Sequence, residues 1–149
     1  MSYKSILVVC VGNICRSPVA ELMLRHALPA CRVESAGLAA VVGAGMESTA
    51  RQLVEAGGLD GSAHRARQLT RELCRQADLI LVMEGNHREG VASLCPEARG
   101  KTFLLCQGLP EPEVADPYRR SPEFFARVHA RIEAGCASWA GRLAMAGAR

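Results

Sequence analysis

The sequence has no long hydrophobic run, no closely spaced cysteine pair and no marked excess of either charge. Its first apolar segment, Ile6–Val11, is far shorter than the roughly 20 residues of a membrane-spanning helix, and no small-residue cleavage site follows it. Eighteen Lys and Arg against fifteen Asp and Glu leave a net charge of +3, which is too small and scattered to predict a nucleic-acid-binding surface. We therefore expect neither direct membrane insertion nor a nucleic-acid partner.

Cysteine usage indicates a reducing compartment. The seven cysteines are odd in number and include no CxxC pair, which argues against a disulfide framework. We expect a cytoplasmic protein in which most of these thiols are free. The GxxxxGK[ST] pattern of nucleotide-binding P-loops is also missing, so a nucleoside triphosphatase is set aside.

Apolar segments alternate with helical patterns along the chain. Strands are expected at Ile6–Val11, Cys31–Ser35, Leu79–Met83 and Lys101–Cys106. Helices are expected from Ser17 to Pro29, at Glu47–Ala56 and His87–Leu94, and from Ser121 onward. In the first and last of these helices, Ser-Pro dipeptides should supply the N-cap and the first residue. The order predicts one α/β domain over residues 1–149, with a four-stranded parallel sheet doubly wound by helices on both faces.

A phosphate-binding loop is expected directly after the first strand. Ligands of parallel sheets bind beyond the carboxyl ends of the strands, and the segment Val11–Cys15 lies at that edge, just before a helix. Its backbone N–H groups and the helix dipole can form an anion cradle. Gly12 should allow an unusual backbone angle and Asn13 a left-handed one. Arg16 can close the cradle with a bidentate grip on a phosphoryl group.

Cys10 is then the candidate nucleophile. At the floor of such a cradle, N–H dipoles, Arg16 and the Ser17 hydroxyl would stabilise a thiolate. That thiolate could displace a leaving group at phosphorus and form a phosphocysteine without a metal or cofactor. A buried strand cysteine is the simpler interpretation of Cys10 alone, but the combination with Arg16 and Ser17-Pro18 favours catalysis.

A general acid should lie on a loop above the cradle. Asp116 in Asp116-Pro117-Tyr118 follows the fourth expected strand, so it reaches the same edge of the sheet as Cys10. It could protonate the leaving oxygen and later accept a proton from the attacking water. On local sequence alone, Asp-Pro is more typical of the start of a turn than of a catalytic acid.

With Cys10-x5-Arg16-Ser17-Pro18 near one end and Asp116-Pro117-Tyr118 near the other, the chain resembles the low-molecular-weight protein tyrosine phosphatases. Further similarities are Ser35-Ala36-Gly37, the segment His64–Leu69, and Leu79–Met83 leading to His87. The resemblance implies phosphotyrosine hydrolysis with Cys10 as nucleophile, Arg16 as phosphate clamp and Asp116 as acid and then base.

The resemblance also implies roles around these three residues. Ser17 would stabilise the thiolate, Asn13 and Ser35 would brace the loop, and Cys15 is a possible redox partner of Cys10. His64 and His87 match the family pattern and should anchor loops. Ile14 favours tyrosine, because related protein-arginine phosphatases carry threonine there. The expected substrate-binding residues are Val11, Gly12, Asn13, Ile14, Cys15, Ser17, Leu38, Val41 and Tyr118.

The partner follows from two details of the resemblance. Arg119-Arg120-Ser121 after the Asp-Pro-Tyr motif, and Ser35-Ala36-Gly37-Leu38 without a threonine, are similar to bacterial phosphatases paired with exopolysaccharide-exporting tyrosine autokinases. A monomer acting on such a phosphotyrosine protein is expected. Two alternatives stay open: an arsenate reductase of the same fold, which would need two further relay thiols, and a phosphotyrosine-binding module without catalysis.

Overall fold

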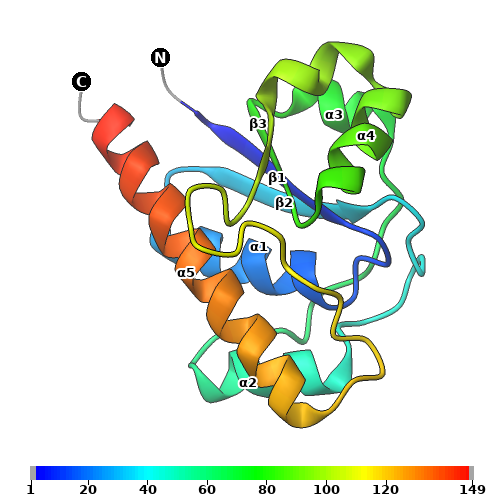
Figure 1. Cartoon of the computed structure of the whole chain (residues 1–149), viewed down its shortest axis with the longest axis vertical. Coiled ribbons are helices and arrows are strands. Elements are labelled where there is room, and N and C mark those ends of the chain that lie inside the picture. The colour runs from blue at the N-terminus through cyan, green and yellow to red at the C-terminus, as the bar shows by residue number, and fades with distance from the viewer. Residues whose placement is uncertain (1–2, 148–149) are drawn as a thin grey trace.

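A four-stranded parallel sheet forms the centre of the protein (Figure 1), whose computed structural model describes residues 3–147. The strands are β1 (Ser5–Cys10), β2 (Arg32–Gly37), β3 (Leu79–Val82) and β4 (Thr102–Leu104), in the order β2-β1-β3-β4. β1 pairs with both β2 and β3, so the strand that ends at Cys10 is central. The parallel α/β sheet predicted from the sequence is confirmed.

Helices cover both faces of this sheet. On one face lie α1 (Arg16–Ala27), α2 (Ser48–Ala56) and the long α5 (Pro122–Gly147), and on the other lie α3 (Arg71–Gln76), α4 (Gly85–Leu94) and the 3-10 helix η1 (Pro96–Lys101). Alternate β1 side chains explain this: Ile6, Val8 and Cys10 pack into the α1/α5 core, whereas Leu7 and Val9 pack into the α3/α4 core. The doubly wound arrangement is confirmed.

The start of α1 differs from the prediction. The helix begins at Arg16, and Cys15 occupies the N-cap position without a side-chain cap. Ser17 is therefore inside the helix, and its prediction as N-cap was wrong. The left-handed backbone of Asn13 (φ 58°) turns the chain early and releases the Ser17 hydroxyl for another contact. In α5 the expected cap is present, since Phe124 N donates to Ser121 Oγ at 3.2 Å.

β1 and β2 end side by side at the edge where the loop begins. β1 stops at Cys10, one residue before the expected end, and β2 continues beyond the expected Ser35 to Gly37, which is the partner of Cys10. A Cβ on Gly37 would lie only 2.3 Å from the carbonyl oxygen of Val11. Glycine at this position thus lets β2 approach the loop closely.

The long helix α5 packs lengthwise on this core. Its buried stripe contains Phe125, Val128, Ile132, Cys136 and Trp139. Among residues 3–147, the structure contains no helix with enough length and apolar character to cross a membrane.

Candidate active site

The loop between β1 and α1 turns its carbonyl groups outward. All five carbonyls from Cys10 to Ile14 accept hydrogen bonds from neighbouring segments. The donors, in chain order, are Leu38 N at 2.9 Å, Ala39 N at 3.0 Å, Val41 N at 3.1 Å, His64 Nε2 at 2.6 Å and Glu47 N at 2.8 Å.

The N–H groups of the same loop are free to bind an anion. Those of residues 11–15 donate to no group that the structure describes. They directly precede the N-terminus of α1, whose positive dipole adds to them, at the position predicted for the anion cradle. The left-handed conformation predicted for Asn13 is confirmed, whereas Gly12 has no positive φ and a Cβ there would meet only ordinary contacts. The special angle expected at Gly12 was therefore wrong.

Cys10 lies at the end of β1 with its sulfur beside Ser17. The distance from Cys10 Sγ to Ser17 Oγ is 2.9 Å. Ser17 Oγ accepts a hydrogen bond of 2.8 Å from the side-chain nitrogen Nδ2 of Asn13. The hydroxyl proton of Ser17 is therefore available to the sulfur. Arg67 N donates to Asn13 Oδ1 at 2.9 Å and thereby fixes which end of the amide faces Ser17. In this direction the Ser17 hydroxyl can donate to the sulfur of Cys10.

The same amide continues the chain of hydrogen bonds to β2. Asn13 Nδ2 also donates to Ser35 Oγ at 2.9 Å, and Ser35 donates to Glu21 Oε1 at 2.5 Å. Glu21 is buried on α1 and forms an ion pair of 2.8 Å with Arg25. Sequence reasoning found Asn13 and Ser35 but missed Glu21, whose position one helical turn after Ser17 was the available signal.

Arg16 is fixed from two sides. Its side chain is only 2% exposed, and Nη1 donates to Glu84 Oε2 at 2.6 Å and to the carbonyl oxygen of Val114 at 2.9 Å. Nη2 lies 4.0 Å from Asp116 Oδ2. The guanidinium thus connects the cradle, the end of β3 and the Asp116 loop. Glu84 was missed from the sequence, although it follows the apolar run of β3 at the functional edge.

His87 supports Glu84 from the first turn of α4. Its Nδ1 accepts a hydrogen bond of 3.2 Å from Glu84 N, as a neutral imidazole can. Burial, followed by the charge of Arg16, lowers the pKa of His87 below its usual 6.5. His87 therefore anchors a loop, as expected, and so does His64, whose Nε2 meets the carbonyl oxygen of Asn13.

Asp116 lies in a local turn and beside Arg16. Its Oδ1 accepts a hydrogen bond of 3.0 Å from Tyr118 N, which is a local turn. Its Oδ2 faces Arg16, and the side chain is 54% exposed. A carboxyl group that is held by a turn beside the clamp and reached by solvent can exchange protons at this site.

Four of the residues expected to bind the substrate fall into two groups. Val11, Val41 and Tyr118 are exposed, and Val41 lies against Gly12 at the rim of the loop. Leu38 instead packs onto Gly90 of α4. A Cβ added to Gly90 would lie 3.0 Å from the Leu38 side chain. Leu38 belongs to the α3/α4 core, so the structure does not bring it together with the rim.

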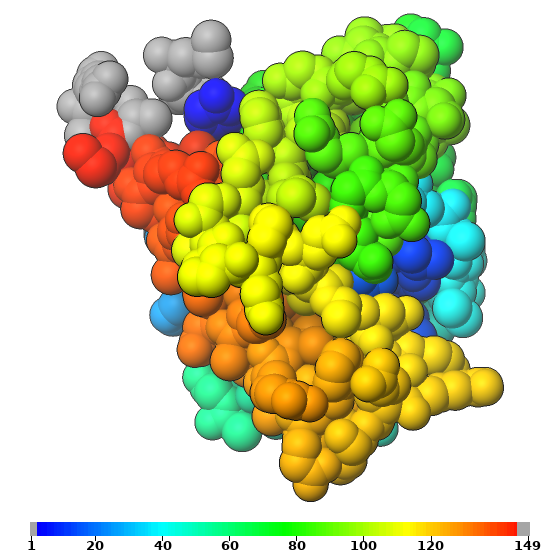
Figure 2. Space-filling view, in the orientation of Figure 1, coloured from blue at the N-terminus to red at the C-terminus, as the bar shows by residue number. Residues whose placement is uncertain are grey.

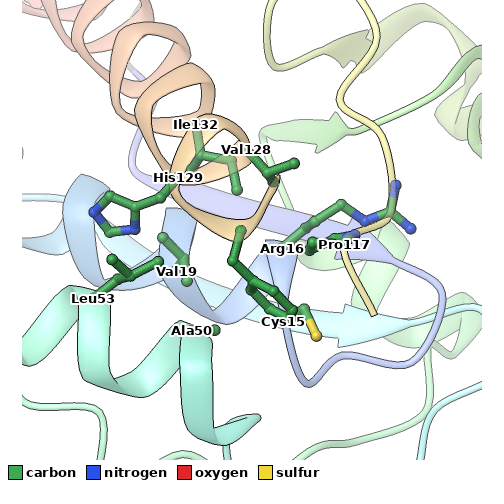
Figure 3. Close-up of a pocket in the computed structure, with 10 residues that line it drawn as sticks. Cys15, Arg16, Val19, Ala50, Leu53, Pro117, Val128, His129 and Ile132 are labelled. Carbon is green, nitrogen blue, oxygen red and sulfur yellow. The ribbon is translucent and has the colours of Figure 1, made fainter. Parts of the chain in front are cut away.

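The Cys15 side chain is buried. It lines a small apolar cavity of about 10 Å³ between α1, α2 and α5, whereas the Arg16 guanidinium points out of it (Figure 3). Burial, with a smaller contribution from Glu47, raises the pKa of Cys15 to about 12. A protonated thiol is a weak nucleophile, so the redox role expected for Cys15 stays a prediction.

Comparison with known proteins agrees with this geometry. Residues 5–148 match the family described as low molecular weight phosphotyrosine protein phosphatase. The chain belongs to this family. It is a low molecular weight protein-tyrosine-phosphatase, as the resemblance of its sequence motifs implied.

Close relatives of this phosphatase cover nearly all of it. Wzb of Escherichia coli K12 is 48% identical over 138 residues, which are 93% of this chain and 94% of Wzb. Etp of the same strain is 43% identical over 143 residues, covering 96% and 97%. Among solved structures, Vibrio vulnificus Wzb in complex with benzylphosphonate has a TM-score of 0.92 and 42% identity, covering 95% of this chain and all of that one.

Proposed function

We propose that this phosphatase hydrolyses protein phosphotyrosine in two steps, with Cys10, Arg16 and Asp116 as the catalytic residues. In the first step the Cys10 thiolate attacks phosphorus, an Sγ–P bond forms and the bond to the tyrosine oxygen breaks. Asp116 gives its proton to that oxygen. In the second step water attacks phosphorus and gives a proton to Asp116 while the Sγ–P bond breaks, which releases phosphate and the thiolate.

The orientation of the loop is the observation that carries this proposal. With these five carbonyls bonded to neighbouring segments, the N–H groups of residues 11–15 have no partner among the described residues and are available to an anion above Cys10. The equatorial oxygens of a phosphoryl group carry more charge in the transition state, and such fixed donors stabilise that charge. Arg16 is already held beside them by Glu84 and Val114.

Three features support tyrosine as the leaving group. Val41 and Tyr118 give the rim an apolar and aromatic surface on which a phenyl ring can pack. Ile14 stands where the related arginine phosphatases carry threonine. The Vibrio relative binds benzylphosphonate, which also joins an aromatic ring to a phosphorus group. Phosphoserine would be too short to use this rim.

We infer that the physiological substrate is a bacterial tyrosine autokinase of exopolysaccharide production, dephosphorylated in the cytoplasm by a monomer of this phosphatase. The similarity to Wzb and Etp supports this partner, as does the Arg119-Arg120-Ser121 sequence. Co-purification of the kinase with a trapping variant, Cys10→Ser, from the native cell would test it. Capture of other phosphoproteins without a tyrosine kinase would contradict it.

Activity is tested with 4-nitrophenyl phosphate in the presence of a metal chelator. We expect turnover that Cys10→Ser abolishes. Cys31→Ser is the matched control, because Cys31 is a partly exposed thiol at the far end of β2. Loss of turnover with the chelator, or full activity of Cys10→Ser, would refute the mechanism.

The position of two further cysteines disfavours an arsenate reductase. Cys74 and Cys95 lie in the α3/α4 core, on the opposite face of the sheet from Cys10. Burial is the main cause that raises the pKa of each. An electron relay needs accessible thiolates near the nucleophile.

A further inference from the structure

Three exposed arginines lie over two aromatic rings within residues 118–127, just after Asp116, and we call this set the arginine–aromatic strip. Arg119 lies over the ring of Tyr118 at 5.3 Å, and Arg120 lies over the ring of Phe124 at 4.1 Å. Arg127, one turn further along α5, also lies over the ring of Phe124, at 5.4 Å from its centroid. The strip therefore extends from the rim of the active site along the start of α5.

These guanidinium groups are exposed and carry uncompensated charge. None of the three is within ion-pair distance of an acidic group among residues 3–147, although Glu123 lies in the same segment. By contrast, Arg71, Arg75 and Arg99 on the opposite face all have glutamate partners. Figure 2 shows the segment that contains the strip, yellow to orange, projecting at the lower right.

Stacking prepares these arginines to bind anions. A guanidinium held flat on a ring loses little further freedom, and its N–H edges stay available for bidentate contacts with an oxyanion. Arg119 also has a left-handed backbone with φ of 63°, which a non-glycine residue adopts at a cost. That backbone directs the chain so that Arg119 and Arg120 lie over different rings.

We propose that this arginine–aromatic strip binds carboxylate side chains on either side of the phosphotyrosine in the substrate, so that the enzyme selects acidic segments. The inference rests on the proposed function and names its substrate class. With the phosphotyrosine in the cradle, the neighbouring residues of an extended peptide, about 3.3 Å apart along the chain, extend over Tyr118 and onto the strip. Asp or Glu there meets free guanidinium groups, whereas Lys or Arg meets like charges.

The test compares phosphotyrosine peptides whose flanking residues are all neutral, acidic or basic. For the unmodified enzyme we expect kcat/KM to be about tenfold higher with acidic than with neutral flanks, and lowest with basic flanks. The preference should shrink as ionic strength rises. Hydrolysis of neutral peptides without any preference for acidic ones would overturn this inference and leave the proposed function intact.

A triple variant locates the preference. In R119G/R120A/R127A the ratio of kcat/KM for acidic peptides to kcat/KM for neutral peptides should fall close to one. Glycine adopts the left-handed backbone at position 119 without strain, so this substitution should not destabilise the fold. The control R71A/R75A/R99A removes the same charge from the opposite face and should keep the ratio. An equal fall in both variants would contradict the strip. So would a preference confined to peptides with a second phosphotyrosine.

Discussion

Arg16 Nη1 lies 2.6 Å from Glu84 Oε2, which joins the phosphate loop to the end of the neighbouring strand β3. The arginine is almost completely buried, and its Nε has no hydrogen-bond partner in the described structure. A buried guanidinium is costly unless its charge is balanced, and Glu84 supplies that balance. The carboxylate thus keeps Arg16 in position before a phosphoryl group arrives.

Removing this carboxylate should impair the clamp. We expect Glu84→Ala to lower kcat/KM for aryl phosphates by about ten- to a hundredfold, because Arg16 loses its fixed direction. Glu84→Gln keeps an acceptor and should lose less. Steady-state kinetics measures both, with Glu89→Ala on the exposed face of α4 as control. A Glu84→Ala enzyme as active as the control would remove Glu84 from this role.

The direction of the Asn13–Ser17–Cys10 hydrogen bonds gives a second prediction. Aspartate also tolerates a left-handed backbone, so Asn13→Asp should keep the shape of the loop. Its side chain has no N–H group that could donate to Ser17. The Ser17 hydroxyl would then donate to the new carboxylate rather than to the sulfur.

We expect iodoacetate to alkylate Cys10 about tenfold more slowly at neutral pH in this variant, as for a lost hydrogen bond to a charged group. Ser17→Ala should show a similar loss, and the double variant little more than either single one. Fully additive losses would mean that the two residues act separately.

Much of this site is readable from the sequence because its main groups lie at strand ends. Cys10 ends β1, Arg16 begins the helix that follows it, and Asp116 lies in the loop after β4. A parallel sheet brings the segments that follow its strands to one edge. Glu84 was missed because only packing between β3 and α1 brings its carboxylate to Arg16. The same holds for the backbone N–H of Arg67, which reaches Asn13 from a distant segment. Glu21 is local to α1, but its contact with Ser35 depends on how α1 packs on β2. The prediction that Leu38 binds the substrate was wrong for a related reason. An apolar loop residue can line a binding site, but the path of the backbone decides which side chains face that site.

The capping of α1 illustrates another limit. Ser17-Pro18 and Ser121-Pro122 are the same local signal, yet only Ser121 caps a helix. At Ser17 a competing partner, the sulfur of Cys10, is available across the loop. Local preference loses to a tertiary contact there, which is typical of functional sites.

The pH dependence of the free energy of unfolding should reflect the lowered pKa of His87. Burial, followed by Arg16, lowers its pKa in the folded state below the unfolded value of about 6.5. The unfolded state therefore binds more protons below pH 6.5, and the free energy of unfolding falls as the pH drops through that range.

His87→Gln should flatten this fall between pH 7.5 and 5.5 in urea unfolding. His129→Gln should do the same, because burial also lowers the pKa of His129. An unchanged slope in His87→Gln would show that its imidazole titrates alike in both states.

Asp116 can be tested for acid catalysis separately from its turn. The Oδ1 contact with Tyr118 N needs only an acceptor, whereas protonation of a leaving oxygen needs an ionisable group. Asp116→Asn keeps the acceptor and loses the ionisable group.

We expect Asp116→Asn and Asp116→Ala to lower kcat/KM for phenyl phosphate by about 10²–10⁴-fold. The loss should be far smaller for 4-nitrophenyl phosphate, whose leaving group needs little protonation. Because kcat/KM reports only the steps up to the first P–O cleavage, later hydrolysis of the phosphocysteine does not blur the comparison. Equal losses on both substrates would remove Asp116 as the acid, and retention of activity by the asparagine variant alone would assign it to the turn.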